Sequence, residues 1–327
     1  MKFFPLRVLI VGCGNIAGGF DEDRVGSQFP YTHAGAYSRD KRFSLEACVD
    51  PDDQRRIKFM DSWNVTNGFR TFDEIHKAGY KFDVISICSP SGCHAYDLDV
   101  ALRIKPKLIF CEKPVTTSLK ETERLIEKCR INNVLLSVNY SRRFDPDVSI
   151  LKFDIESGRW GELRSVVGCY NKGLLNNGSH MIDLLNLLIG NMKIVHVGKP
   201  VIDFFQNDPA VPIWLEGVGG VPIHIACANA NDYSIFELQF VFSNGLLRME
   251  DGGLFWHERR IEDSEIFKGY RVLNQGVRRA GKYPSAMMQS LENIHQAITK
   301  GAPLLSSGES ALLTQEICEK IVHMVVT

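Results

Sequence analysis

Residues Val8–Phe20 read VLIVGCGNIAGGF, an apolar run that passes directly into a glycine-rich turn. Gly12, Gly14 and Ala17 fit the pattern G-x-G-x-x-[GA], which in dinucleotide-binding folds follows a strand and opens a helix. Gly12 allows the tight turn, Gly14 lets the backbone approach a pyrophosphate, and the small Ala17 lets the helix pack on the strand. That helix is expected to direct its first amides at the phosphates. These first residues are Asn15, Ile16 and Ala17. The alternative interpretation is a βα turn that holds no ligand.

The composition is that of a folded protein with two domains. The 327 residues exceed the usual size of one domain, 44% are hydrophobic, 24% are charged, and the net charge is −1. This charge balance argues against nucleic-acid binding, and no uncharged apolar stretch is long enough to predict a membrane span. Nine cysteines occur without a C-x-x-C pair, and several lie in apolar runs. Buried, reduced thiols in a cytoplasmic protein are therefore expected.

The first part of the chain alternates short apolar runs with longer amphipathic ones. Most of the short runs lack strict alternation, as strands buried on both faces should. Between them, Ser118–Asn132 is the clearest predicted helix, with Ser118 and Glu121 at the spacing of a capping box. This order predicts a doubly wound, parallel α/β domain over residues 1–139. The predicted strands are Arg7–Val11, Ser44–Val49, Phe82–Cys88, Lys107–Cys111 and Val134–Asn139.

The pattern changes after Pro146. A predicted helix at Asp147–Ser157 is followed by longer strand-like segments such as Ser234–Phe242, in which large apolar residues fall at every second position. Such a segment predicts an antiparallel sheet that packs on helices through one face. The other face, with Ile235 and Val241 beside polar groups, is amphipathic enough to bind a second subunit. Residues 140–327 are thus predicted to form an α+β domain. Further helices are predicted at Ser285–Lys300 and from Glu309 onward.

The second predicted strand ends at Asp50, whose carboxylate could accept hydrogen bonds from the hydroxyls of an adenine ribose. This favours NAD over NADP, although Arg55 and Arg56 weaken the preference because arginine can accept a 2′-phosphate. The alternative is that Asp50 belongs to the N-cap region of a helix. Asp50 lies further from the glycine turn than the usual 20 or so residues. We attribute the excess to an insertion at Gly18–Thr32, either a binding loop or a disordered excursion.

Three further stretches carry polar side chains that could act in a site. Two of them follow predicted strands, where ligands of open parallel sheets bind, and the third opens a predicted helix. Each of these residues could instead have a purely structural role, as a helix-capping histidine, a surface lysine or a structural carboxylate. A metal site is not favoured, because no third His, Cys or carboxylate lies at a spacing from His180 and Asp183 that is typical of metal ligands. The candidate residues are Ser89, Pro90 and His94, then Glu112, Lys113 and Pro114, and finally Asn176, His180 and Asp183.

Several motifs, in one order along nearly the whole chain, resemble the glucose-fructose oxidoreductase, inositol dehydrogenase and rhizopine-catabolism (Gfo/Idh/MocA) family. They are GCGNIA, HAGAY, CSPSGCH, CEKP, NYSRRFDP and GSHMIDLL, with a terminal GESALLTQEICEKIV. The resemblance implies a Rossmann domain that binds NAD, with NADP as the second choice. It also implies a C-terminal domain with a large, open, mostly antiparallel sheet. Through that sheet the family often forms homodimers or homotetramers.

The resemblance also implies roles for individual residues. Lys113 would contact the reacting hydroxyl and the nicotinamide ribose, and His180 would accept a proton or orient the hydroxyl. Glu112 would be part of the environment of the cofactor or of Lys113. Many dehydrogenases of the family carry aspartate four residues before the histidine, whereas this chain has Asn176, which cannot take a proton. Either His180 or Lys113 then performs the acid/base work, or dehydrogenation is impaired. The remaining cofactor contacts implied are Ser89, Pro90 and His94.

These features predict an NAD-dependent oxidoreductase that transfers a hydride between the nicotinamide C4 and a hydroxyl-bearing carbon of a sugar, cyclitol or nucleotide sugar. His180, assisted by Lys113 and Asn176, would remove the hydroxyl proton. Two alternatives stay open. One is an enzyme that retains NAD and re-reduces what it has oxidised, as in epimerisation or glycoside cleavage. The other is a non-catalytic NAD(P)-binding regulatory protein.

Overall fold

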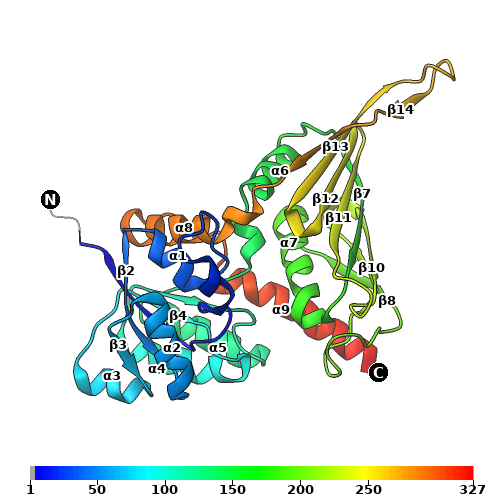
Figure 1. Cartoon of the computed structure of the whole chain (residues 1–327). Helices are drawn as coiled ribbons and strands as arrows, with labels where there is room; N and C mark the ends of the chain where they lie inside the picture. The colour runs from blue at the N-terminus through cyan, green and yellow to red at the C-terminus, as the bar shows by residue number, and fades with distance from the viewer. Residues whose placement is uncertain (1–3, 327) are drawn as a thin grey trace. The chain divides into compact units, whose positions relative to one another are not determined.

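The computed structural model describes residues 4–326, which form two compact units (Figure 1). The first unit comprises residues 4–144 and 284–312, and the second comprises residues 145–283 and 313–326. The chain therefore returns to the first unit after building the second sheet. The sequence analysis placed all residues from 140 onward in the second domain and did not predict that residues 284–312 belong to the first unit. An amphipathic pattern identifies a helix, but it does not identify the surface on which that helix packs.

Among the described residues, the first unit contains a six-stranded parallel sheet in the order β3-β2-β1-β4-β5-β6. The order reverses between β1 and β4, as in doubly wound folds, so the predicted fold class is confirmed. The strand β3 was not predicted because its three residues are too few to show a pattern. The strands are β1 (Leu6–Val11), β2 (Phe43–Val49), β3 (Asn67–Phe69), β4 (Val84–Ile87), β5 (Leu108–Cys111) and β6 (Leu135–Val138).

Helices pack against this sheet, and the apolar side chains on one of its faces form a core with residues of helices α3, α4 and α5. The predicted helix after Ser118 is present as α5, with Ser118 at its N-cap, but the capping box is absent. Within the described chain the Ser118 side chain makes no capping hydrogen bond, and Glu121 instead accepts a hydrogen bond from Arg124 at 2.9 Å. The helices are α1 (His33–Arg39), α2 (Asp53–Trp63), α3 (Phe72–Ala78), α4 (His94–Ile104), α5 (Leu119–Ile131) and α8 (Ala286–Lys300).

The chain beyond the glycine turn differs from the expected continuous helix. A short turn and the 3-10 helix η1 (Gly19–Arg24) follow, and α1 begins only after Thr32. The first two amides of α1 donate hydrogen bonds to the carbonyls of Ile16, at 3.2 Å, and Ala17, at 2.8 Å. Residues 18–32 therefore leave the turn and return beside it, which is the behaviour of an insertion.

The second unit is built on a nine-stranded sheet, as far as the described residues show, in the order β14-β13-β12-β11-β7-β10-β9-β8, with β15 beside β13. Strands β7 and β10 are parallel and the other paired strands are antiparallel, so the predicted mostly antiparallel sheet is confirmed. The strands are β7 (Leu163–Tyr170), β8 (Lys193–Val197), β9 (Ile213–Glu216), β10 (Pro222–Cys227), β11 (Phe236–Phe242), β12 (Gly245–Glu250), β13 (Phe255–Asp263), β14 (Arg271–Leu273) and β15 (Val277–Ala280).

One face of this sheet packs on helices α6 (Pro146–Glu156), α7 (Ser179–Ile189) and the last part of α9 (Gly308–Val326). The alternation in β11 places its large apolar side chains in this core, as predicted. They are Phe236, Leu238, Phe240 and Phe242, all buried. The outer face is open, and Val167 and Trp214 are about half exposed there. This asymmetry is what an amphipathic strand pattern produces.

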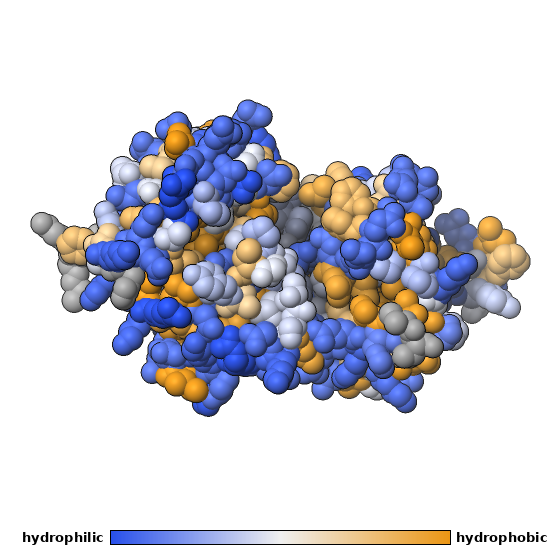
Figure 2. Space-filling model, turned by 90° about the horizontal axis from the view of Figure 1, so that it is seen from below, coloured by the Kyte–Doolittle hydropathy of each residue, from blue (hydrophilic) through white to orange (hydrophobic). Residues whose placement is uncertain are grey.

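The surface is mixed in character. Figure 2 shows charged and polar side chains interspersed with separate apolar patches on the face that it draws. Across residues 4–326, no helix combines the length and the apolar character needed to cross a membrane.

Candidate functional site

Strand β1 passes into the glycine turn at Gly12, whose φ of +84° lies in the left-handed region. A Cβ atom at this position would lie 2.6 Å from the backbone of Ser89, so only glycine lets the turn pass this close to the end of β4. Gly14 differs, because a Cβ atom there would meet no atom of the described residues within 4 Å. The space beside Gly14 is therefore open to a ligand.

A pocket of about 500 Å³ opens beside Gly14. Its wall is formed by the glycine turn, by η1 and by the start of α2, and most of the wall is polar. Backbone groups and charged side chains of this kind suit the phosphates and riboses of a dinucleotide, so the residues present fit that cofactor. Of the predicted cofactor residues, Gly14 and Asn15 line the pocket, whereas Ile16 and Ala17 do not. The lining residues are Cys13, Gly14, Asn15, Gly19, Glu22, Asp52, Gln54, Arg55 and Lys58.

Asp50 directly follows β2 and is 2% exposed. Its Oδ2 atom accepts the amide of Cys13 at 2.9 Å, and its Oδ1 atom accepts the amide of Asp52 at 2.9 Å. The carboxylate thus holds the glycine turn against the start of α2. Asp52, and not Asp50, caps the helix by accepting the amide of Arg55 at 3.0 Å. The Arg55 guanidinium also lies 3.5 Å from Asp50, so the pocket carries charges of both signs.

His94 joins the ends of two neighbouring strands. Ser89 and Pro90 follow β4, and His94 opens α4 with 1% of its surface exposed. Its Nδ1 atom lies 2.7 Å from the carbonyl oxygen of Pro114, and its Nε2 atom lies 2.8 Å from the carbonyl oxygen of Ser89. Both ring nitrogens therefore contact backbone, and His94 ties the loop after β4 to the segment that carries Lys113.

Glu112 lies directly after β5 and receives hydrogen bonds from two distant side chains. His33 Nε2 lies 3.0 Å from Oε1, and Asn139 Nδ2 donates to the same oxygen at 2.7 Å. Burial alone would raise the pKa of Glu112, but these hydrogen bonds and the charge of Lys113 hold it below its ordinary value. His33 and Asn139 were not among the predicted site residues, although the motifs HAGAY and NYSRRFDP contain or adjoin them.

Lys113 is partly buried beside Glu112 and is followed by a cis peptide bond to Pro114. His94 contacts the Pro114 carbonyl from one side, and Glu112 is held by His33 from the other. The E-K-P segment is thus fixed at both ends by buried groups of the same unit. An ammonium on so rigid a segment can bind and orient a hydroxyl group.

Asn176 belongs to the second unit and lies in a π-helical turn, Gly173–Gly178, that precedes α7. Asp208 holds this turn, because its carboxylate accepts the amides of Leu175 and Asn176, both at 2.8 Å. The Asn176 side chain donates to the carbonyl of Lys172 at 3.1 Å. Asp208 was not predicted, since it lies in an irregular segment without a pattern that would mark it.

His180 is the second residue of α7 and is partly buried. Asp183, one turn further along, is 1% exposed and accepts a hydrogen bond from the Thr314 hydroxyl at 3.1 Å. This contact agrees with the alternative that Asp183 is a structural carboxylate. Lys113 belongs to the first unit, whereas Asn176 and His180 belong to the second.

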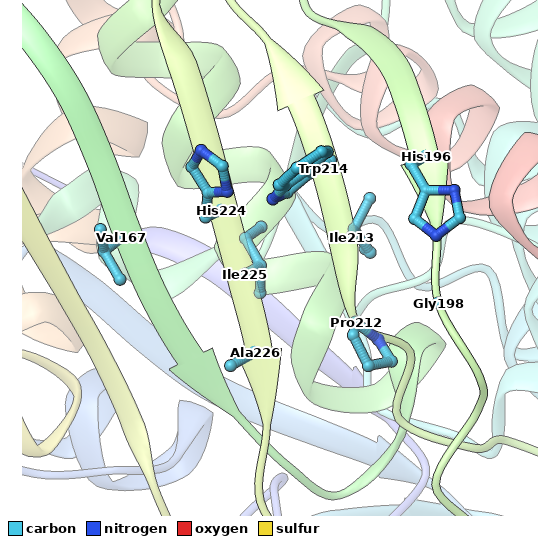
Figure 3. A pocket seen from close by; sticks show the side chains of 9 residues that line it. All are labelled: Val167, His196, Gly198, Pro212, Ile213, Trp214, His224, Ile225 and Ala226. Carbon is cyan, nitrogen blue, oxygen red and sulfur yellow. The ribbon is translucent and has the colours of Figure 1, made fainter.

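A second hollow, of about 460 Å³, lies on the outer face of the second sheet and was not predicted (Figure 3). Its lining is almost wholly apolar and comes from β7, β8, β9 and β10. Trp214 stands between two histidines, with ring centroids 6.4 Å from His196 and 4.7 Å from His224. This hollow interrupts the face that the sequence predicts to bind a second subunit.

Among the described residues, no three His, Cys, Asp or Glu side chains are grouped as a metal ion would require. All nine cysteines lie in the described part of the chain and are free thiols. The candidate sites for the predicted chemistry are the polar pocket and the E-K-P segment of the first unit and the turn before α7 in the second.

A doubly wound parallel sheet with a polar pocket at its first glycine turn is the arrangement of a nucleotide-binding domain of the Rossmann type. Residues 6–140 match a family model described as "Oxidoreductase family, NAD-binding Rossmann fold". The chain is 34% identical over 280 residues to inositol 2-dehydrogenase of Rhizobium meliloti, which covers 78% of this chain and 82% of that one. The chain therefore belongs to the Gfo/Idh/MocA family of oxidoreductases.

Two other comparisons show how far the similarity extends. An uncharacterised oxidoreductase of Bacillus subtilis, YrbE, is 36% identical over 132 residues, but this match covers only 39% of this chain and 37% of that one. A protein from Desulfitobacterium hafniense, provisionally assigned as an NADPH-dependent oxidoreductase, has a structure that matches with a TM-score of 0.82. Its sequence is 18% identical, and the match covers 99% of this chain and 96% of that one. The fold is thus shared along the whole chain.

Proposed function

We propose that the protein is an NAD-dependent dehydrogenase that acts on a hydroxyl-bearing carbon of a sugar, cyclitol or nucleotide sugar. The observation that carries the proposal lies within the first unit. The glycine turn, the loop after β4 and the E-K-P segment after β5 follow the carboxyl ends of neighbouring parallel strands, where ligands of doubly wound sheets bind. The substrate class is supported by the relative named inositol 2-dehydrogenase.

The pocket beside Gly14 would hold the adenosine and phosphate part of the dinucleotide. The open space at Gly14 admits the pyrophosphate, and the Asp52 carboxylate in the wall can accept hydrogen bonds from ribose hydroxyls. When bound, the nicotinamide supplies the redox chemistry by accepting or returning a hydride at C4. NAD is proposed over NADP because the acidic groups of Glu22, Asp50 and Asp52 would oppose a further phosphate.

Lys113 and His180 would handle the proton of the reacting hydroxyl. Imidazole changes its charge near neutral pH, which suits His180 to the role of base. Lys113, on its rigid segment, would hold the hydroxyl oxygen by a charged hydrogen bond. Asn176 would orient a neighbouring hydroxyl, since its amide can donate and accept hydrogen bonds but cannot remove a proton.

The test is a substrate panel with the purified protein. The panel contains myo-inositol and scyllo-inositol, common aldoses and nucleotide sugars, each supplied with NAD⁺ or NADP⁺, and the formation of reduced cofactor is recorded. We expect NADH from at least one polyol or sugar. No turnover with any compound, together with no binding of either nucleotide by calorimetry, would refute the proposal.

Two other outcomes would support the alternatives. Co-purified NAD with substrate conversion but no net NADH would indicate transient oxidation, as in epimerisation or glycoside cleavage. NAD⁺ binding without any conversion would indicate a regulatory protein, which Asn176 in place of the usual acid favours.

We also propose that the outer face of the second sheet binds a second copy of the chain. The exposed Val167 and Trp214 and the apolar hollow of Figure 3 support this proposal. Light scattering after size exclusion should show a dimer or tetramer that Trp214→Glu dissociates and that Ile131→Glu, on an exposed helix of the first unit, does not. A cytoplasmic location remains a further proposal, supported by the nine free thiols.

A further inference from the structure

The insertion at residues 18–32 follows a course fixed by one buried carboxylate. Asp21 is 1% exposed and accepts hydrogen bonds from the amide of Tyr31 at 2.7 Å and from the amide and hydroxyl of Thr32, both at 2.8 Å. Gly35 makes this approach feasible, because a Cβ atom there would lie 2.6 Å from Asp21 Oδ2. The start of the insertion is thereby tied to its end.

The same segment is attached to helix α2. Gly18 packs so closely on this helix that a Cβ atom would overlap the side chain of Trp63 and lie 2.9 Å from Phe59. One turn later, the Glu22 carboxylate forms an ion pair with the Lys58 ammonium at 2.6 Å. Both side chains belong to the wall of the pocket beside Gly14. The insertion therefore contributes an acidic group directly to the candidate cofactor site.

Among the described residues that line this pocket, each cationic side chain has an acidic partner. Lys58 pairs with Glu22, and Arg55 lies 3.5 Å from Asp50 and 3.6 Å from Asp52. Both oxygens of Asp50 already accept hydrogen bonds from backbone amides. Asp50 therefore affects a ligand in the pocket mainly through its negative charge. A 2′-phosphate on the ribose would bring about two further negative charges and would need a cation that is not already neutralised.

We infer that Glu22 determines the cofactor specificity of the pocket by neutralising Lys58 and so excluding NADP. The inference rests on the proposed function, because it presupposes that the pocket binds the adenosine end of a nicotinamide dinucleotide. In most folds of this type the acidic residue after the second strand makes this selection. Here that residue, Asp50, holds the glycine turn, and the insertion supplies Glu22 as a further carboxylate.

The experiment is a calorimetric titration of the full chain with NAD⁺ and with NADP⁺, so that no substrate is needed. Glu22→Gln leaves Lys58 without its anionic partner, and NADP⁺ should then bind about tenfold more tightly while NAD⁺ affinity changes less than about twofold. Asp23→Asn is the matched control, because Asp23 lies in the same 3-10 turn but is exposed and does not line the pocket. Its ratio of NADP⁺ to NAD⁺ affinity should equal that of the unmodified protein.

Lys58→Met provides a second, independent variant. Combined with Glu22→Gln it should abolish the gain in NADP⁺ affinity, because the cation that binds the phosphate is then missing. Coincident thermal unfolding curves would establish that the variants fold. If the unmodified chain binds NAD⁺ and Glu22→Gln leaves the affinity ratio unchanged, the inference is overturned while the proposed function stands. If the unmodified chain binds neither nucleotide, the proposed function itself fails, and the inference with it.

Discussion

His33 Nε2 lies 3.0 Å from Oε1 of Glu112, although 79 residues separate the two side chains in sequence. His33 directly follows the last residue of the insertion, Thr32, and Glu112 directly precedes Lys113. The His33 ring is fully buried and packs on Phe110, with ring centroids 4.6 Å apart. The contact therefore joins the loop at the cofactor pocket to the segment that carries the proposed catalytic lysine.

Replacing His33 should change how stability depends on pH. Burial raises the pKa of Glu112, but His33 and Asn139 hold it below its ordinary value of 4.5. The ionised carboxylate therefore stabilises the fold above about pH 4.5, and this contribution is lost as the pH falls through the lower, folded-state pKa. In His33→Leu the Glu112 carboxylate remains buried but loses the hydrogen bond from His33. The free energy of unfolding at about pH 7 should therefore fall by about 1–3 kcal/mol.

Urea unfolding followed between about pH 7 and pH 3 measures this effect. His33→Leu should lose less stability on acidification than the unmodified protein. The control is Glu123→Gln, an exposed position on α5, which should reproduce the unmodified pH curve. An unchanged pH curve in His33→Leu would show that the His33 contact does not govern Glu112.

Lys113→Met should separate cofactor binding from turnover. The ammonium is proposed to hold the reacting hydroxyl, so kcat should fall by about 100-fold or more. The affinity for NAD⁺, measured by calorimetry, should stay within about threefold, because the pocket beside Gly14 does not include this residue. Lys120→Met, an exposed lysine on α5, should leave both quantities unaltered. Full turnover in Lys113→Met would remove this residue from the site.

Alanine at the two glycines of the turn should give opposite results. At Gly12 the new Cβ atom would collide with the Ser89 backbone at a φ of +84°, so Gly12→Ala should lower the free energy of unfolding by about 2–4 kcal/mol. At Gly14 the space is open, so Gly14→Ala should fold with a stability loss below about 1 kcal/mol, yet bind NAD⁺ about tenfold more weakly. Equal NAD⁺ affinity in Gly14→Ala and the unmodified protein would place the phosphates elsewhere.

Asp208→Asn should loosen the turn that carries Asn176. The carboxylate accepts the amides of Leu175 and Asn176, and an amide side chain offers one acceptor oxygen in place of two. We expect a stability loss of about 1–2 kcal/mol and, with the substrate identified in the panel, a raised KM with unchanged NAD⁺ affinity. Asp232→Asn, at an exposed position of the same unit, is the control. A raised KM in both variants would assign the effect to charge rather than to the turn.

Asp21→Ala should release the insertion without unfolding the unit. Asp21 accepts hydrogen bonds from Tyr31 and Thr32, so its loss should expose the chain at Arg24 and speed tryptic cleavage there by about tenfold or more. Cleavage is read by mass spectrometry of the fragments, and NAD⁺ bound before digestion should slow it. Asp23→Ala, whose side chain is exposed in the same turn, should be cleaved at the unmodified rate. Equal rates in both variants would contradict an anchoring role for Asp21.

The sequence alone was sufficient for the features that depend on neighbouring residues. The apolar run before Gly12 predicted the first strand and its turn, and the alternation through Phe236–Phe242 predicted which face of β11 is buried. The excess length before Asp50 also predicted that residues 18–32 leave the glycine turn as a separate segment. Each of these patterns lies within one element or one turn, where backbone geometry and side-chain period are set locally.

Tertiary structure alone decided which distant groups meet. Glu22 with Lys58, and His33 with Glu112, join elements whose local patterns contain no sign of the partner. The capping box expected at Ser118 failed, and α8 belongs to the first unit although it follows the second sheet in sequence. The physical reason is that a hydrogen bond or ion pair between distant residues forms only where several elements have packed together, and that packing depends on the whole buried surface rather than on any one stretch of chain.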